Sequence, residues 1–146
     1  MATFAGNHLY PFWKQALMQE IPGDKSLDIG DDVPAAGVYL ALVTTDGGYV
    51  YSDSHQFYNS VTNVQGTPER ITTPTVSGRV FSGDSAVYTE VSGTMIGAII
   101  LYRANAGTSD TWRLVLYEDT GIIGIPMLPN GGNIIVDWND QGIFGL

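Results

Sequence analysis

Apolar positions recur with a period of two from about residue 36 onward, which is the spacing of side chains on one face of a β-strand. Residues 38–43 are apolar at almost every position, which predicts a central strand buried on both faces. Asp46-Gly47-Gly48 predicts a turn, and residues 49–51 are expected to return as the second strand of a hairpin. The pattern predicts a looser strand over residues 56–61.

The later part of the chain continues the same alternation. Pro74 cannot donate to a strand ladder, so residues 71–76 are expected to form an edge strand or a loop. Further strands are predicted over 79–81, 86–91, 94–103, 111–117 and 134–138. In the last of these, Trp138 shares a face with Ile134 and Val136, so it is expected to close the core. The prediction is an all-β fold, an antiparallel β-sandwich or jelly roll of about seven to nine strands.

Residues 1–33 have a different pattern. Pro11 suits the first position of a helix, and Pro22-Gly23 ends it, so a helix is expected to run to about residue 20. A helix of about ten residues is unstable alone and must dock on something. We therefore predict an N-terminal arm over residues 1–33, with a short helix and an acidic loop, followed by a β-sandwich domain over 34–146. The arm residues expected to contact another protein are Phe4, Leu9, Tyr10, Phe12, Trp13 and Leu17.

Charge and hydropathy restrict the classes of partner that this chain is expected to bind. The net charge is −9, with six basic and fifteen acidic residues, which opposes binding to nucleic acid and to anionic membranes. The longest apolar stretch is about eight residues, far below the roughly 20 that span a bilayer. The opening residues lack a basic region followed by a long apolar run, so a secretory signal is not expected.

The sequence offers few candidate catalytic or metal-binding residues. The absence of cysteine removes thiolate metal sites and cysteine nucleophiles. His55 follows Ser52-Asp53-Ser54, but no Gly-x-Ser-x-Gly motif supports a catalytic triad. Asp24, Asp28, Asp31 and Asp32 do not have the spacing of an EF-hand loop and are interpreted as a solvated acidic loop. We expect no catalytic residue, no metal and no cofactor. Clustered carboxylates leave a small hydrolase as an alternative, through Glu118, Asp119 or Asp137.

The two ends of the chain resemble a known class of proteins. Asn7-His8-Leu9-Tyr10, residues 13–17 and residues 38–42 resemble the opening of small virion-associated proteins of tailed bacteriophages. The closing stretch, Pro129-Asn130-Gly131-Gly132 followed by Val136-Asp137-Trp138-Asn139 and Gly142-Ile143-Phe144, is the more specific match. The resemblance implies a structural virion protein, assembled in the host cytoplasm, and it implies no catalytic residues.

Within that class, the resemblance implies a capsid decoration (cement) protein or a tail-associated protein. The expected partners are the major capsid protein, further copies of this chain, or both. A carbohydrate-binding or receptor-binding β-sandwich module remains an alternative, because exposed aromatic residues on such folds often bind sugars.

Overall fold

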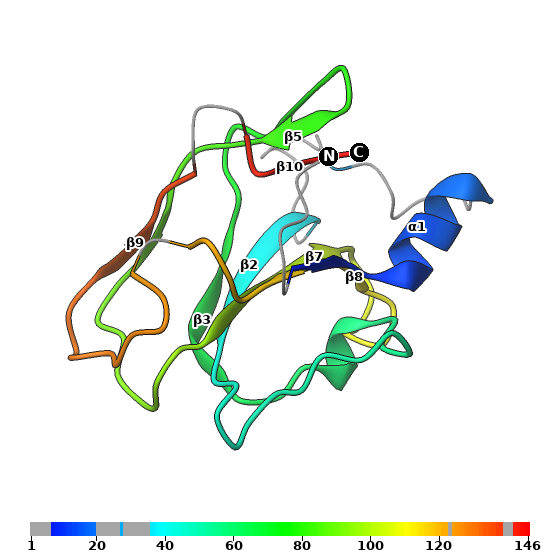
Figure 1. Ribbon diagram of the computed structural model, residues 1–146. Coiled ribbons are helices and arrows are strands. Elements are labelled where there is room, and N and C mark those ends of the chain that lie inside the picture. The colour runs from blue at the N-terminus through cyan, green and yellow to red at the C-terminus, as the bar shows by residue number, and fades with distance from the viewer. Residues whose placement is uncertain (1–6, 20–26, 28–35, 123, 139–141) are drawn as a thin grey trace.

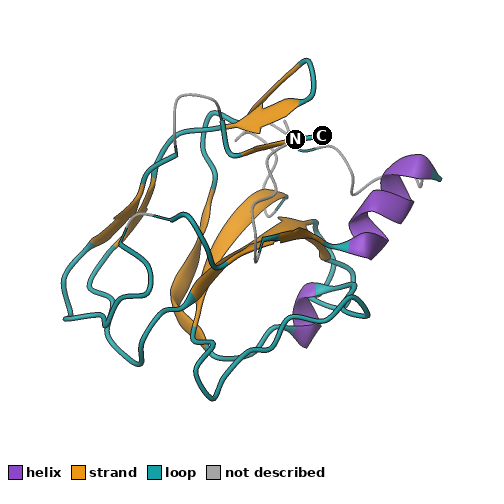
Figure 2. Cartoon of the chain, viewed as in Figure 1, coloured by secondary structure: helices purple, strands orange, loops and turns teal. Residues whose placement is uncertain are grey.

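The computed structural model describes residues 7–19, 27, 36–122, 124–138 and 142–146, and these form a mostly antiparallel β structure with one short α-helix (Figures 1 and 2). This confirms the predicted all-β class. The elements in chain order are β1 (His8–Leu9), α1 (Pro11–Met18), β2 (Gly37–Val43), the 3-10 helix η1 (Tyr58–Ser60), β3 (Val64–Arg70), β4 (Thr75–Ser77), β5 (Val80–Ser82), β6 (Ala86–Tyr88), β7 (Ala98–Ala104), β8 (Arg113–Glu118), β9 (Ile134–Val136) and β10 (Phe144–Gly145).

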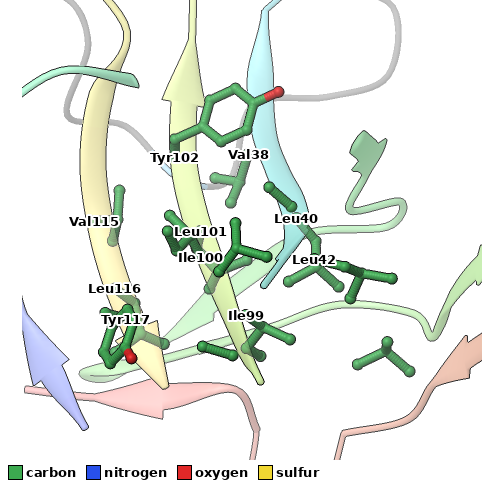
Figure 3. Close-up of a cluster of buried hydrophobic side chains, with 14 of the residues drawn as sticks. Val38, Leu40, Leu42, Ile99, Ile100, Leu101, Tyr102, Val115, Leu116 and Tyr117 are labelled. Carbon is green, nitrogen blue, oxygen red and sulfur yellow. The ribbon is translucent and has the colours of Figure 1, made fainter. Parts of the chain in front are cut away.

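The main sheet has five strands in the order β1-β8-β7-β2-β3, and all neighbouring pairs are antiparallel. Every residue of β7 is buried, and β2 is buried except at Tyr39, so the middle of this sheet is covered on both faces. Figure 3 shows apolar side chains of β2, β7 and β8 clustered across the three strands. The nearly continuous apolar run over residues 38–43 is therefore explained by its central position, as predicted.

Two smaller sheets, β10-β5-β4 and β6-β9, accompany the main sheet. In Figure 1, β5 and β10 lie above β2 and β7, and β9 lies at one end of the molecule. Tyr88 of β6 reaches β2, where its hydroxyl donates to the carbonyl oxygen of Leu40. The β2–β3 register shifts between Leu40 and Leu42. This register shift lies next to the Leu40 carbonyl, which accepts the hydrogen bond from Tyr88. Tyr88 therefore anchors the β6–β9 sheet to the main sheet.

The segment over residues 44–63 begins with the turn after β2 and packs on the sheet through aromatic rings. The turn forms as predicted, with the N–H of Tyr49 donating to the carbonyl of Thr44 at 2.8 Å. The predicted strands over 49–51 and 56–61 are wrong: neither range contains a strand, and η1 occupies part of the second. Tyr49 and Tyr51 instead direct their rings into an aromatic cluster, and that tertiary packing outweighs the local strand preference.

The helix prediction is confirmed, since α1 begins with Pro11 at its first turn. The prediction of a separate arm requires correction for its described residues. Leu9 belongs to β1, which pairs with Leu116 of β8, and the N–H of Tyr10 donates to the carbonyl of Val115 at 3.0 Å. The N-terminal segment thus completes the main sheet, because β8 would otherwise present an unpaired edge there.

Candidate functional site

Aromatic residues gather on one face of the main sheet. Seven of the eight tyrosines take part in ring contacts there: Tyr10, Tyr39, Tyr49, Tyr51, Tyr58, Tyr102 and Tyr117. Cross-strand register places His8 opposite Tyr117, and Tyr39 opposite Tyr102. Residues directly opposite on antiparallel strands share a face, so both pairs project from the sheet in a fixed arrangement.

Three of these side chains form a hydrogen-bonded series, which we call the Tyr–His chain: Tyr10, Tyr49 and His55. The hydroxyls of Tyr10 and Tyr49 are 2.8 Å apart, and the Tyr49 hydroxyl lies 2.7 Å from Nδ1 of His55. Tyr10 and Tyr49 are buried, and His55 is half-buried. Burial raises the pKa of Tyr10 and of Tyr49, so both phenols stay protonated at physiological pH. The Tyr–His chain therefore joins the N-terminal segment to the segment over residues 44–63.

A second group of rings lies beside the Tyr–His chain and reaches the surface. The exposed His8 stacks on Tyr51, with ring centroids 4.4 Å apart. The Tyr51 hydroxyl donates to Asp53 at 2.7 Å, and the Tyr117 hydroxyl donates to Asp119 at 3.2 Å. Asp53 and Asp119 are thus each held by the phenol of a tyrosine in this group.

A separate stack, which we call the Tyr102 cluster, contains Tyr39, Tyr58, Tyr102 and Trp112. Tyr58 lies over Tyr102, with centroids 3.9 Å apart, and the Trp112 ring is within 9° of parallel to Tyr102. The indole N–H of Trp112 donates to the carbonyl of Gly107 at 3.1 Å, which fixes its orientation. Tyr102 is buried, whereas its three neighbours are half-buried and reach solvent.

The two-stranded sheet carries an exposed apolar pair. Val87 of β6 and Ile135 of β9 are directly opposite each other and are 47% and 61% exposed. Their neighbours along each strand are buried: Ala86, Tyr88, Ile134 and Val136. We call Val87 and Ile135 the β6–β9 pair. Because adjacent residues on a strand point to opposite faces, this sheet has an inner face in the core and an outer apolar face in solvent.

Charged groups in the described part of the chain do not assemble a metal site. No group of three or more His, Cys, Asp or Glu residues there is placed to hold a metal ion. Asp24, Asp28, Asp31 and Asp32 lie outside the described residues. Burial raises the pKa of Glu118 to about 7. Asp137 accepts a hydrogen bond from Ser85, and Asp119 accepts one from Thr120 as well as from Tyr117.

The predicted contact residues differ in how deeply this chain buries them. Leu9, Tyr10 and Trp13 are buried in the core of this chain, so the prediction that they contact another protein is wrong for this fold. Phe12 and Leu17 are half-buried, and Phe4 lies outside the described residues. Short apolar patterns do not reveal whether the surface that covers them belongs to the same chain.

The β6–β9 pair was missed by the sequence reasoning. Alternation within residues 86–88 and 134–136 predicts two faces, but both faces are apolar. Only the pairing of the two strands shows which apolar side chains meet in solvent.

No protein-family model matches the chain, and no curated protein sequence matches it. Among the described helices, none is long and apolar enough to cross a membrane.

Proposed function

We propose that this chain is a structural virion protein of a tailed bacteriophage, and more specifically a decoration protein that binds the outer surface of the capsid. The resemblance of its closing stretch to small virion-associated proteins supports this assignment. In the proposal the chain acts by binding other protein surfaces, and its partners are the major capsid protein, copies of itself, or both.

The observation that carries the proposal is the exposed β6–β9 pair. Two β-branched side chains side by side on the outer face of a small sheet are costly to leave in water. A partner that covers them would gain apolar burial without any rearrangement of the sheet, because their inner neighbours already hold it on the core. The pair provides a rigid apolar contact rather than a catalytic group.

Electrostatics support an outer rather than an inner position. A surface facing packaged DNA gains affinity from Lys and Arg side chains that neutralise phosphates. This chain has a net charge of −9 and only six basic residues, so it would be repelled by concentrated duplex.

The proposal is tested by binding to capsid shells. The double variant Val87→Ser, Ile135→Ser should bind purified shells at least about tenfold more weakly than the wild type, measured by cosedimentation. The matched control is Val50→Ser, which alters a valine that is 75% exposed in a loop and should bind as the wild type does. Binding unchanged in the double variant would contradict a role for the pair. Shells that bind no wild-type protein would contradict the decoration function.

A second candidate function is carbohydrate binding, which the Tyr102 cluster favours. Tyr39, Tyr58 and Trp112 are half-buried around a buried ring, and Trp112 is held by its own hydrogen bond. Rigid aromatic rings that reach solvent suit the apolar faces of sugars. A glycan array with wild type and Trp112→Ala separates the two candidates, because only the carbohydrate function predicts glycan binding that the variant loses.

A further inference from the structure

The buried Tyr10 determines the direction in which hydrogen bonds are donated along the Tyr–His chain. Tyr10 is fully buried, and its hydroxyl has one hydrogen-bond partner among the described residues, the Tyr49 hydroxyl. A buried hydroxyl that cannot donate is costly, so Tyr10 donates to Tyr49. Tyr49 has a single proton and therefore donates it to Nδ1 of His55. Neutral His55 must then carry its own proton on Nε2.

Protonation of His55 is incompatible with that direction. A protonated imidazole carries a hydrogen on both nitrogens, so Nδ1 becomes a donor to the Tyr49 oxygen. The Tyr49 proton then turns toward Tyr10, whose hydroxyl loses its acceptor, or the Tyr49 oxygen accepts from both neighbours and its own proton loses its acceptor. In either arrangement one buried hydroxyl has no acceptor among the described residues.

Tyr10 occupies the junction between β1 and α1. Its N–H donates to the carbonyl of Val115 in β8, and its carbonyl accepts the N–H groups of Trp13 and Lys14 at the start of the helix. We propose that the Tyr–His chain is an acid-sensitive latch: protonation of His55 reverses its hydrogen bond with Tyr49, leaves one tyrosine hydroxyl without an acceptor, and weakens the attachment of β1 and α1 to the sheet.

The other titratable groups around the latch have their own partners. Asp53 and Asp119 accept hydrogen bonds from Tyr51 and Tyr117, whose rings contact those of Tyr10 and Tyr49 respectively. His8 stacks on Tyr51 and is exposed. Among the described residues no carboxylate contacts His55, whose side-chain hydrogen bond is to Tyr49, so a charged imidazole gains no ion pair there that would offset the lost acceptor.

The first test uses the wild-type protein. NMR of the His55 ring nitrogens at pH 8 should show the proton on Nε2. On acidification, the backbone amides of β1 and α1 should shift together with the ring as it becomes protonated. A proton on Nδ1 at pH 8, or amides of β1 and α1 that do not respond, would overturn the proposal.

The second test compares thermal melts at pH 8 and pH 5. The fall in Tm between these values should be larger in the wild type than in His55→Gln, which cannot be protonated, by roughly 2–4 °C. Tyr49→Phe should behave like His55→Gln, because it removes the hydroxyl that links His55 to Tyr10. His8→Gln is the matched control and should keep the wild-type dependence. Equal pH dependence in the wild type and His55→Gln would refute the latch.

Discussion

Asn7 is hydrogen-bonded in both directions to Thr120, a residue 113 positions away in the chain. Its side-chain Nδ2 donates to the Thr120 carbonyl at 3.0 Å, and its Oδ1 accepts the Thr120 N–H at 3.1 Å. The same oxygen accepts the N–H of Asp119 at 2.9 Å. One buried amide thus ties the segment before β1 to the turn that follows β8.

We predict that Asn7→Ala destabilises the protein by about 2 kcal/mol. The variant loses three hydrogen bonds, each contributing roughly 0.5–1.5 kcal/mol, and water at the exposed turn replaces part of the loss. Urea unfolding measures the change. Asn130→Ala is a suitable comparison, since its side chain accepts one hydrogen bond, from Gly132 in an exposed turn, and should cost less than about 1 kcal/mol. Equal losses in the two variants would refute the special role of Asn7.

The two tryptophans at the ends of the chain should differ in their contributions. Trp13 is fully buried on α1, so Trp13→Ala should cost roughly 3–5 kcal/mol. Trp138 packs on the core but is half-buried, and its N–H donates to the carbonyl of Asp84 at 3.1 Å. Its removal should therefore cost about half as much. Chemical denaturation of both variants checks the order, and a larger loss for Trp138→Ala would contradict it.

Glu118 should make stability fall as the pH rises. Burial raises the pKa of its carboxyl to about 7 in the folded state, against an ordinary value of 4.5. The favourable contribution of the protonated form is complete below pH 4.5 and is lost as the pH rises through 7. Allowing for partial exposure and solvent screening, the loss is about 2 kcal/mol.

Replacing Glu118 by Gln tests this sign. Glu118→Gln should unfold at higher urea concentration than the wild type at pH 8 and at nearly the same concentration at pH 4.5. Asp46→Asn, in an exposed turn, serves as the control for loss of one negative charge. A variant that is less stable than the wild type at pH 8 would show that the carboxylate has a stabilising partner.

The sequence predicted the elements whose patterns are strong and local. The continuous apolar run before Asp46 became the central strand β2, and the strands predicted over 94–103 and 111–117 correspond to β7 and β8. It missed β3, where Gly66 and Pro68 interrupt the alternation. That strand is at the edge of the sheet, where a proline is tolerated.

The candidate site was harder to predict from the sequence, because the fold and not the local pattern creates its contacts. Tyr10 comes from the N-terminal segment, whereas Tyr49 and His55 come from the segment over residues 44–63, and only the fold brings their polar atoms within hydrogen-bond distance. The apolar and aromatic residues near the N-terminus suggested contacts with a partner because nothing in their spacing identifies β8 as the surface that they cover. Long-range pairing decided that question, as it did for Val87 and Ile135.

The most direct test of the proposed function is a density map of particles produced from the genome that encodes this chain. The proposal predicts the chain on the outer capsid surface, with Val87 and Ile135 covered by the shell or by a neighbouring copy. Density for the chain on the inner capsid wall or only in the tail would contradict it, and so would particles that lack the chain.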